Sequence, residues 1–224
     1  MSEYRFMNHL IEKEHIPTPA YVFDLDKMKE FAEKVKRCLT GKAEICYAMK
    51  ANPFLIKPML EIVSSLEVCS PGEFRICERA GIPMEKIVLS GVYKNPDDIA
   101  YMLDTYGNRG TYTVESLQHL KVLNDTAVNH GITLSVLIRV TSGNQFGIDE
   151  AEIRKIISER EKYTGVEIEG IQFYSGTQKR NLSQMQEELK HLDAFIGELE
   201  EIGGMEIRTL EYGPGFFVPY FVKD

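Results

Sequence analysis

The sequence is poor in the patterns that mark several common classes of protein. It has only four cysteines, Cys38, Cys46, Cys69 and Cys77, with no CxxC spacing, so buried free thiols are expected rather than disulfides. Its five histidines are scattered and form no HxxxH pair, so no metal site is indicated. No apolar run approaches the roughly 20 residues needed to cross a bilayer, and the N-terminus lacks the apolar core of a signal peptide. We therefore expect a cytoplasmic protein that does not bind membranes.

An excess of positive charge is also absent. The formal net charge is −8, whereas affinity for a phosphate backbone needs clustered lysine and arginine, so no nucleic acid partner is expected. The chain has 224 residues, which is enough for one domain with a substantial core and near the minimum for a (β/α)8 barrel. We expect a single domain over residues 1–224, with a leader at 1–17.

What the sequence does contain is an alternation of short apolar runs and helical patterns. An extended run at 20–23 precedes a helix that Asp24 or Asp26 can cap and that continues to about Leu39. A strand over 44–49 follows. Further helices are expected at about 54–64, 72–81, 96–107, 115–130, 149–162 and 181–203. Further strands are expected near 66–69, 87–90, 111–113, 133–140, 166–174 and 206–212, which makes seven in all.

Strands that are each separated by a helix pair in parallel through right-handed crossovers, in a barrel or in a doubly wound sheet. The G-x-G-x-x-G turn of the dinucleotide-binding doubly wound fold is missing, so the barrel is favoured. In either fold, functional side chains lie at the carboxyl ends of the strands.

Lys50 stands at such a strand end. Alternation along 45–50 places the bulky odd-numbered side chains on one face and the small even-numbered ones, followed by Lys50, on the other. If the small face lines the barrel interior, a partly desolvated lysine loses some of its preference for the charged form and becomes a nucleophile. From spacing alone, a solvated lysine at a strand end is the simpler interpretation.

The residues around Lys50 point to a known family. Tyr47-Ala48-Met49-Lys50-Ala51-Asn52 resembles the Tyr-Ala-x-Lys-Ala-Asn signature of the fold-type III decarboxylases that use pyridoxal 5′-phosphate (PLP), a group that includes diaminopimelate, ornithine and arginine decarboxylases. In that family this lysine forms the Schiff base with the cofactor. Four more segments resemble family motifs in the same order along the chain: 18–24, 67–73, 90–94, and Arg139 with 145–147.

Two glycine-bearing segments complete the resemblance. Residues 170–178 are similar to the family's His-x-Gly-Ser-Gln motif, and residues 211–216 to its Gly-Gly-Gly-Phe loop. Glycine lets backbone N–H groups approach a phosphate closely. Taken singly, 213–215 is an ordinary turn and Thr177 a helix cap. The resemblance implies Lys50 as the catalytic residue and these cofactor contacts: Lys50, Glu67, Arg139, Tyr174, Gly176, Thr177, Gly213, Gly215 and Phe216.

The sequence also departs from the family. Tyr174 replaces the histidine that stacks on the cofactor ring; it offers an aromatic face but no imidazolium. Pro214 removes one N–H from the glycine loop. The family's eighth strand, with Glu-Pro-Gly-Arg, and its C-terminal β domain have no counterpart here, so a truncated or split enzyme is expected, with a second chain or protomer completing the barrel.

The resemblance therefore implies a PLP-binding (β/α)8 barrel without its eighth strand, in an enzyme that decarboxylates an amino acid similar to diaminopimelate, ornithine or arginine. Three alternatives stay open. The same barrel occurs in amino-acid racemases and in PLP carriers without catalytic activity. The chain could also be a pseudoenzyme subunit that binds a partner through unpaired strand edges.

Overall fold

A computed structural model describes residues 3–39 and 41–220. The chain separates into two compact units, Met1–Ile45 and Cys46–Asp224, and each is described by itself. The expected organisation as one domain stays a prediction.

The first unit contains two helices, α1 (Glu3–Lys13) and α2 (Leu25–Leu39). Asp24 caps α2 as expected, because its Oδ1 accepts a hydrogen bond from the Lys27 N–H at 3.0 Å. The run at 20–23 is not part of any described strand. Helix α1 lies in the segment that the sequence analysis treated only as a leader.

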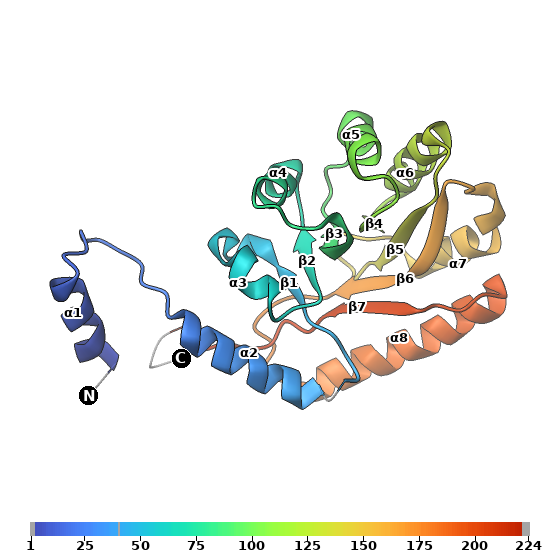
Figure 1. Ribbon diagram of the computed structural model, residues 1–224. Coiled ribbons are helices and arrows are strands. Elements are labelled where there is room, and N and C mark those ends of the chain that lie inside the picture. The colour runs from blue at the N-terminus through green and yellow to red at the C-terminus, as the bar shows by residue number, and fades with distance from the viewer. Residues whose placement is uncertain (1–2, 40, 221–224) are drawn as a thin grey trace. The chain divides into compact units, whose positions relative to one another are not determined.

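The second unit is built on one seven-stranded parallel sheet in which the strand order equals the chain order. Its strands are β1 (Cys46–Ala48), β2 (Ser65–Val68), β3 (Ile87–Leu89), β4 (Thr111–Val114), β5 (Leu134–Val140), β6 (Val166–Tyr174) and β7 (Thr209–Gly213). The sheet curls into an incomplete barrel (Figure 1). This confirms the predicted barrel-type sheet, with seven strands among the described residues, since a doubly wound sheet reverses its strand order at a switch point.

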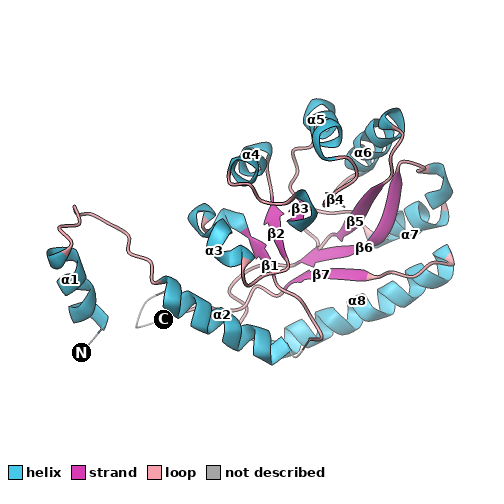
Figure 2. Ribbon diagram, viewed as in Figure 1, coloured by secondary structure: helices cyan, strands magenta, loops and turns pink. Residues whose placement is uncertain are grey.

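Helices connect the strands and cover the outer face of the curled sheet (Figure 2). They are α3 (Ile56–Leu60), α4 (Pro71–Arg79), α5 (Pro96–Tyr106), α6 (Leu117–His130), α7 (Glu150–Ser158) and α8 (Leu182–Gly203). Four of them begin where a polar side chain accepts a hydrogen bond from a backbone N–H of the first turn; the capping residues are Ser70, Asn95, Ser116 and Asn181.

Two elements differ clearly from the expectation. The helix expected at 54–64 is divided into a 3₁₀ helix, η2 (Pro53–Leu55), and the short α3, because Pro58 lacks the N–H that a continuous helix needs. The strand expected over 44–49 ends at Ala48, and Lys50 lies in the 3₁₀ helix η1 (Met49–Ala51).

The two faces of the sheet differ in chemistry. Side chains that point toward the helices are apolar and fully buried, such as Leu66, Val68, Tyr112 and Val114. The alternate positions point into the barrel and are polar near its carboxyl end. Arg139, Gln172 and Glu211 occupy one row of the register across β5, β6 and β7. Most of the hydrophobic core therefore lies between the sheet and the helices, and polar groups gather in the interior near the carboxyl ends of the strands.

Candidate cofactor site at the carboxyl ends of the strands

Lys50 follows β1 at the carboxyl end of the sheet. Met49 is fully buried, with its Sδ 3.4 Å from the Cys77 Sγ of α4, so the bulky face of this segment packs outward as predicted. Lys50 itself is partly exposed. Burial lowers the pKa of Lys50, but the Glu67 carboxylate, with Cys69 and Tyr174, raises it more, so the net shift is upward. Burial therefore has the effect expected from the sequence, but the neighbouring charges leave the pKa of Lys50 above its ordinary value.

Glu67 of β2 is held inside the barrel by polar neighbours. Ser90 Oγ donates to Glu67 Oε1 at 2.8 Å, and Gln172 Nε2 lies 3.5 Å from the same oxygen. The carboxyl of Glu211 on β7 shares this interior. Burial first, and then the charge of Glu67, raise the pKa of Glu211 to about 7, although Gln172 and Cys46 donate to it. Of these two carboxyl groups, that of Glu211 therefore keeps its proton up to near neutral pH.

Arg139 of β5 forms an ion pair with a residue that the sequence analysis did not identify. Its Nη1 lies 2.8 Å from Glu115 Oε2, and the two side chains are 14% and 1% exposed. The guanidinium also lies 5.0 Å from the centre of the Phe146 ring. Lys94 belongs to the same group of charges, and burial lowers the pKa of Lys94 to about 8. Glu115 directly follows β4, and this position at a strand end is the signal that could have identified it.

The two glycine-bearing loops pack against each other. A Cβ on Gly215 would lie 1.9 Å from the carbonyl oxygen of Gly176, and one on Gly213 would lie 2.7 Å from Cδ2 of Tyr174. Gly215 has φ +60° and Gly176 has φ +139°, so both occupy conformations that other residues rarely adopt. Backbone hydrogen bonds join the loops at Lys179, whose N–H donates to Gly215 O at 2.9 Å.

The structure therefore brings together the residues that the sequence analysis singled out at the ends of β1, β2, β5, β6 and β7. Tyr174 is 38% exposed at the end of β6, and its neighbour in the register is Gly213. Thr177 is not the cap of α8, because Asn181 has that position. Phe216 is 58% exposed. The assignment of these residues to the cofactor stays a prediction.

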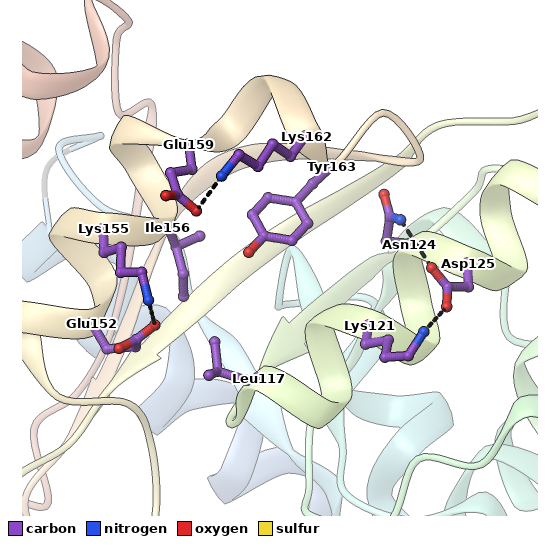
Figure 3. A pocket seen from close by; sticks show the side chains of 10 residues that line it. All are labelled: Leu117, Lys121, Asn124, Asp125, Glu152, Lys155, Ile156, Glu159, Lys162 and Tyr163. Atoms are coloured by element: carbon purple, nitrogen blue, oxygen red, sulfur yellow. Dashed lines mark hydrogen bonds and ion pairs between the residues drawn. The ribbon is translucent and has the colours of Figure 1, made fainter.

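Several features lie outside this site. A cavity of about 340 Å³ between α6 and α7 is lined largely by charged side chains that pair locally, such as Lys155 with Glu152 and Lys162 with Glu159 (Figure 3). All four cysteines are free, as expected, but only Cys77 is buried; Cys46 and Cys69 are partly buried, and Cys38 is exposed. In the part of the chain that the structure describes, no helix is long and apolar enough to cross a membrane.

Comparison with known proteins assigns the chain to a family. The sequence profile of the pyridoxal-dependent decarboxylases, pyridoxal binding domain, matches residues 25–224. The chain belongs to this family, which confirms both the resemblance seen in the motifs and PLP as the family's cofactor.

Individual relatives agree with this assignment. Diaminopimelate decarboxylase from Aquifex aeolicus is 30% identical over 92% of this chain and 52% of its own length. The crystal structure of diaminopimelate decarboxylase from M. jannaschii is 28% identical and superposes with a TM-score of 0.82, over 96% of this chain and 55% of that one. SrLDC in complex with PLP and cadaverine gives 25% identity and a TM-score of 0.81, over 98% of this chain and 55% of that one. The chain thus spans about half the length of the curated relatives it matches.

Proposed function

We propose that this chain is the pyridoxal-binding part of a PLP-dependent amino-acid decarboxylase and that Lys50 is the residue that binds the cofactor covalently. The observation that supports this most directly is the convergence, at one end of the barrel, of Lys50, the Glu67 carboxylate, and the packed loops that contain Gly176 and Gly215.

The residues present fit PLP. The glycines of the two loops have no side chains, so backbone N–H groups there can approach a phosphate closely. Tyr174 offers a partly exposed aromatic face beside them. Lys50 supplies the amine that reacts with an aldehyde.

Each of these residues then has a role in binding or orientation. Lys50 has to lose a proton from Nζ before it can react with an aldehyde, and the nearby Glu67 carboxylate favours the protonated form. Arg139 is held in place by its ion pair with Glu115. It orients polar groups from the side of the barrel opposite Lys50. PLP, when bound, would supply the electron sink that decarboxylation requires.

The substrate class follows from the named relatives. Several are diaminopimelate decarboxylases, and related structures contain L-lysine or cadaverine. We infer an amino acid that carries a second, distal amine. We further propose that a second chain or protomer contributes to the complete site, because β1 and β7 each pair with one strand only among the described residues. The cytoplasmic location stays a prediction.

The test is covalent trapping. The purified chain is incubated with PLP and reduced with borohydride, and the labelled peptide is identified by mass spectrometry. We expect the label on Lys50 and none in K50A, whereas K57A, which alters an exposed lysine in α3, keeps it. A wild-type chain without label on Lys50 would overturn the cofactor assignment. Release of labelled CO₂ from diaminopimelate, lysine, ornithine or arginine then distinguishes decarboxylation from racemization.

A further inference from the structure

A partly buried carboxylate outside the barrel joins the two glycine loops. Glu188 lies in the second turn of α8, the helix that follows the first loop. Its Oε1 accepts from Ser175 Oγ at 2.6 Å, and its Oε2 accepts from Tyr212 OH at 2.6 Å. Ser175 follows β6 and Tyr212 lies in β7, so one side chain is bonded to both segments.

Lys179 completes the contact. Its Nζ lies 2.8 Å from Glu188 Oε2 and 3.1 Å from Oε1, and the two side chains are 5% and 13% exposed. Burial raises the pKa of Glu188, but hydrogen bonds from Lys179, Ser175 and Tyr212 lower it more, so the net shift is downward. The carboxylate is therefore charged at neutral pH, and each of its two oxygens accepts hydrogen bonds.

The backbone of Lys179 also forms hydrogen bonds between the two loops. Its N–H donates to Gly215 O at 2.9 Å, and its carbonyl accepts from the Phe217 N–H at 3.0 Å. Gly176 and Gly215 pack closely just beside this junction. The separation of the two loops therefore depends on where Lys179 is held, and Glu188 holds its side chain.

We propose that Glu188 is a positioning residue for the phosphate-binding loops. This proposal rests on the function proposed above. The carboxylate fixes both glycine loops at the spacing that a phosphate monoester requires without touching the phosphate itself. It also engages the Ser175 hydroxyl, so the hydroxyl donor for the phosphate in the first loop is that of Thr177.

A selective effect on binding follows. Loss of the Glu188 contacts loosens only the part of the site that receives the phosphate, whereas Lys50 and Tyr174 keep their places at the strand ends. Affinity for PLP should fall by about 10-fold or more, as expected for loss of hydrogen bonds to a charged group. Affinity for pyridoxal, which has no phosphate, should change by less than about 2-fold. General destabilisation of the domain would weaken both ligands alike.

The experiment compares E188Q with E187Q, which makes the same change of charge at the exposed neighbouring residue. A milder variant, Y212F, removes one hydrogen bond to Glu188 and keeps the stacking of residue 212 on Phe173, whose ring centre is 6.4 Å away. Y212F therefore tests the proposal even if E188Q does not fold. Hydrogen exchange is measured on each chain without PLP, and PLP and pyridoxal are then titrated in parallel.

We expect E188Q, and to a smaller extent Y212F, to speed amide exchange of Lys179 and Phe217 by about 10-fold, with E187Q like the wild type. Unchanged exchange in both variants, or equal losses of PLP and pyridoxal affinity, would overturn the role of Glu188. These outcomes are distinct from failure of the proposed function, which would appear as a wild-type chain that takes no label on Lys50 while its loop exchange still responds to E188Q.

Discussion

The close approach of the two glycine loops can be tested by adding one methyl group. Gly215 and Gly204 have nearly the same positive φ, +60° and +58°. An added Cβ at Gly204 would meet nothing within 4 Å, whereas at Gly215 it would lie 1.9 Å from Gly176 O. G204A and G215A therefore share the cost of the left-handed conformation and differ in the steric contact.

The expected magnitudes follow from this difference. Alanine in the left-handed region costs about 1–2 kcal/mol, partly offset because alanine restricts the unfolded chain, so G204A should lose about 1 kcal/mol. The contact at Gly215 has to relax from 1.9 Å to at least 3.4 Å, and its neighbour is backbone, which cannot rotate away. Overpacking of this kind adds about 1–3 kcal/mol, so G215A should lose about 2–4 kcal/mol.

Thermal unfolding, followed by circular dichroism and calorimetry, measures both variants. For a chain of this size we expect Tm to fall by about 3 °C in G204A and by about 8 °C or more in G215A. G215A should also bind PLP more weakly, while G204A should bind it like the wild type. Equal Tm shifts in the two variants would refute the reasoning, because the close approach would then contribute nothing.

Three further predictions concern the core, a helix cap and pH. F195A should lose about 3–5 kcal/mol in urea unfolding, because Phe195 is only 2% exposed, whereas L189A on the exposed side of the same helix should lose far less. S116A should lose about 1 kcal/mol, because Ser116 Oγ accepts from the backbone N–H of His119 at 3.2 Å, and no loss would contradict its role as a cap. The pKa of Glu211 is raised from 4.5 to about 7, so the folded chain keeps a proton that the unfolded chain releases. Stability should therefore fall as pH rises through this interval, by about 1.4 kcal/mol per unit, and E211Q should remove this contribution; equal slopes in both chains would show that Glu211 does not titrate there.

The sequence by itself determined the class of fold and the position of Lys50 just after the first barrel strand. Alternating strand and helix periods impose parallel pairing, and the run 45–50 specified which face of β1 packs outward. Asp24 was one of two predicted caps, with Asp26, because capping depends on residues three positions apart, and the structure selects Asp24. The bounds predicted for the helix at 54–64 were wrong, because Pro53 begins a 3₁₀ helix and Pro58 cannot donate the N–H of a continuous helix.

Only the tertiary structure determined the pKa shift of Lys50 and the side-chain contacts made by Arg139 and Glu188. The pKa of Lys50 shifts upward because Glu67, 17 positions away in the printed chain, lies beside it in the barrel. Arg139 is paired with Glu115, and Glu188 joins loops after two different strands. No sequence period encodes these pairs, since they arise when separate strand ends meet at one end of a curved sheet.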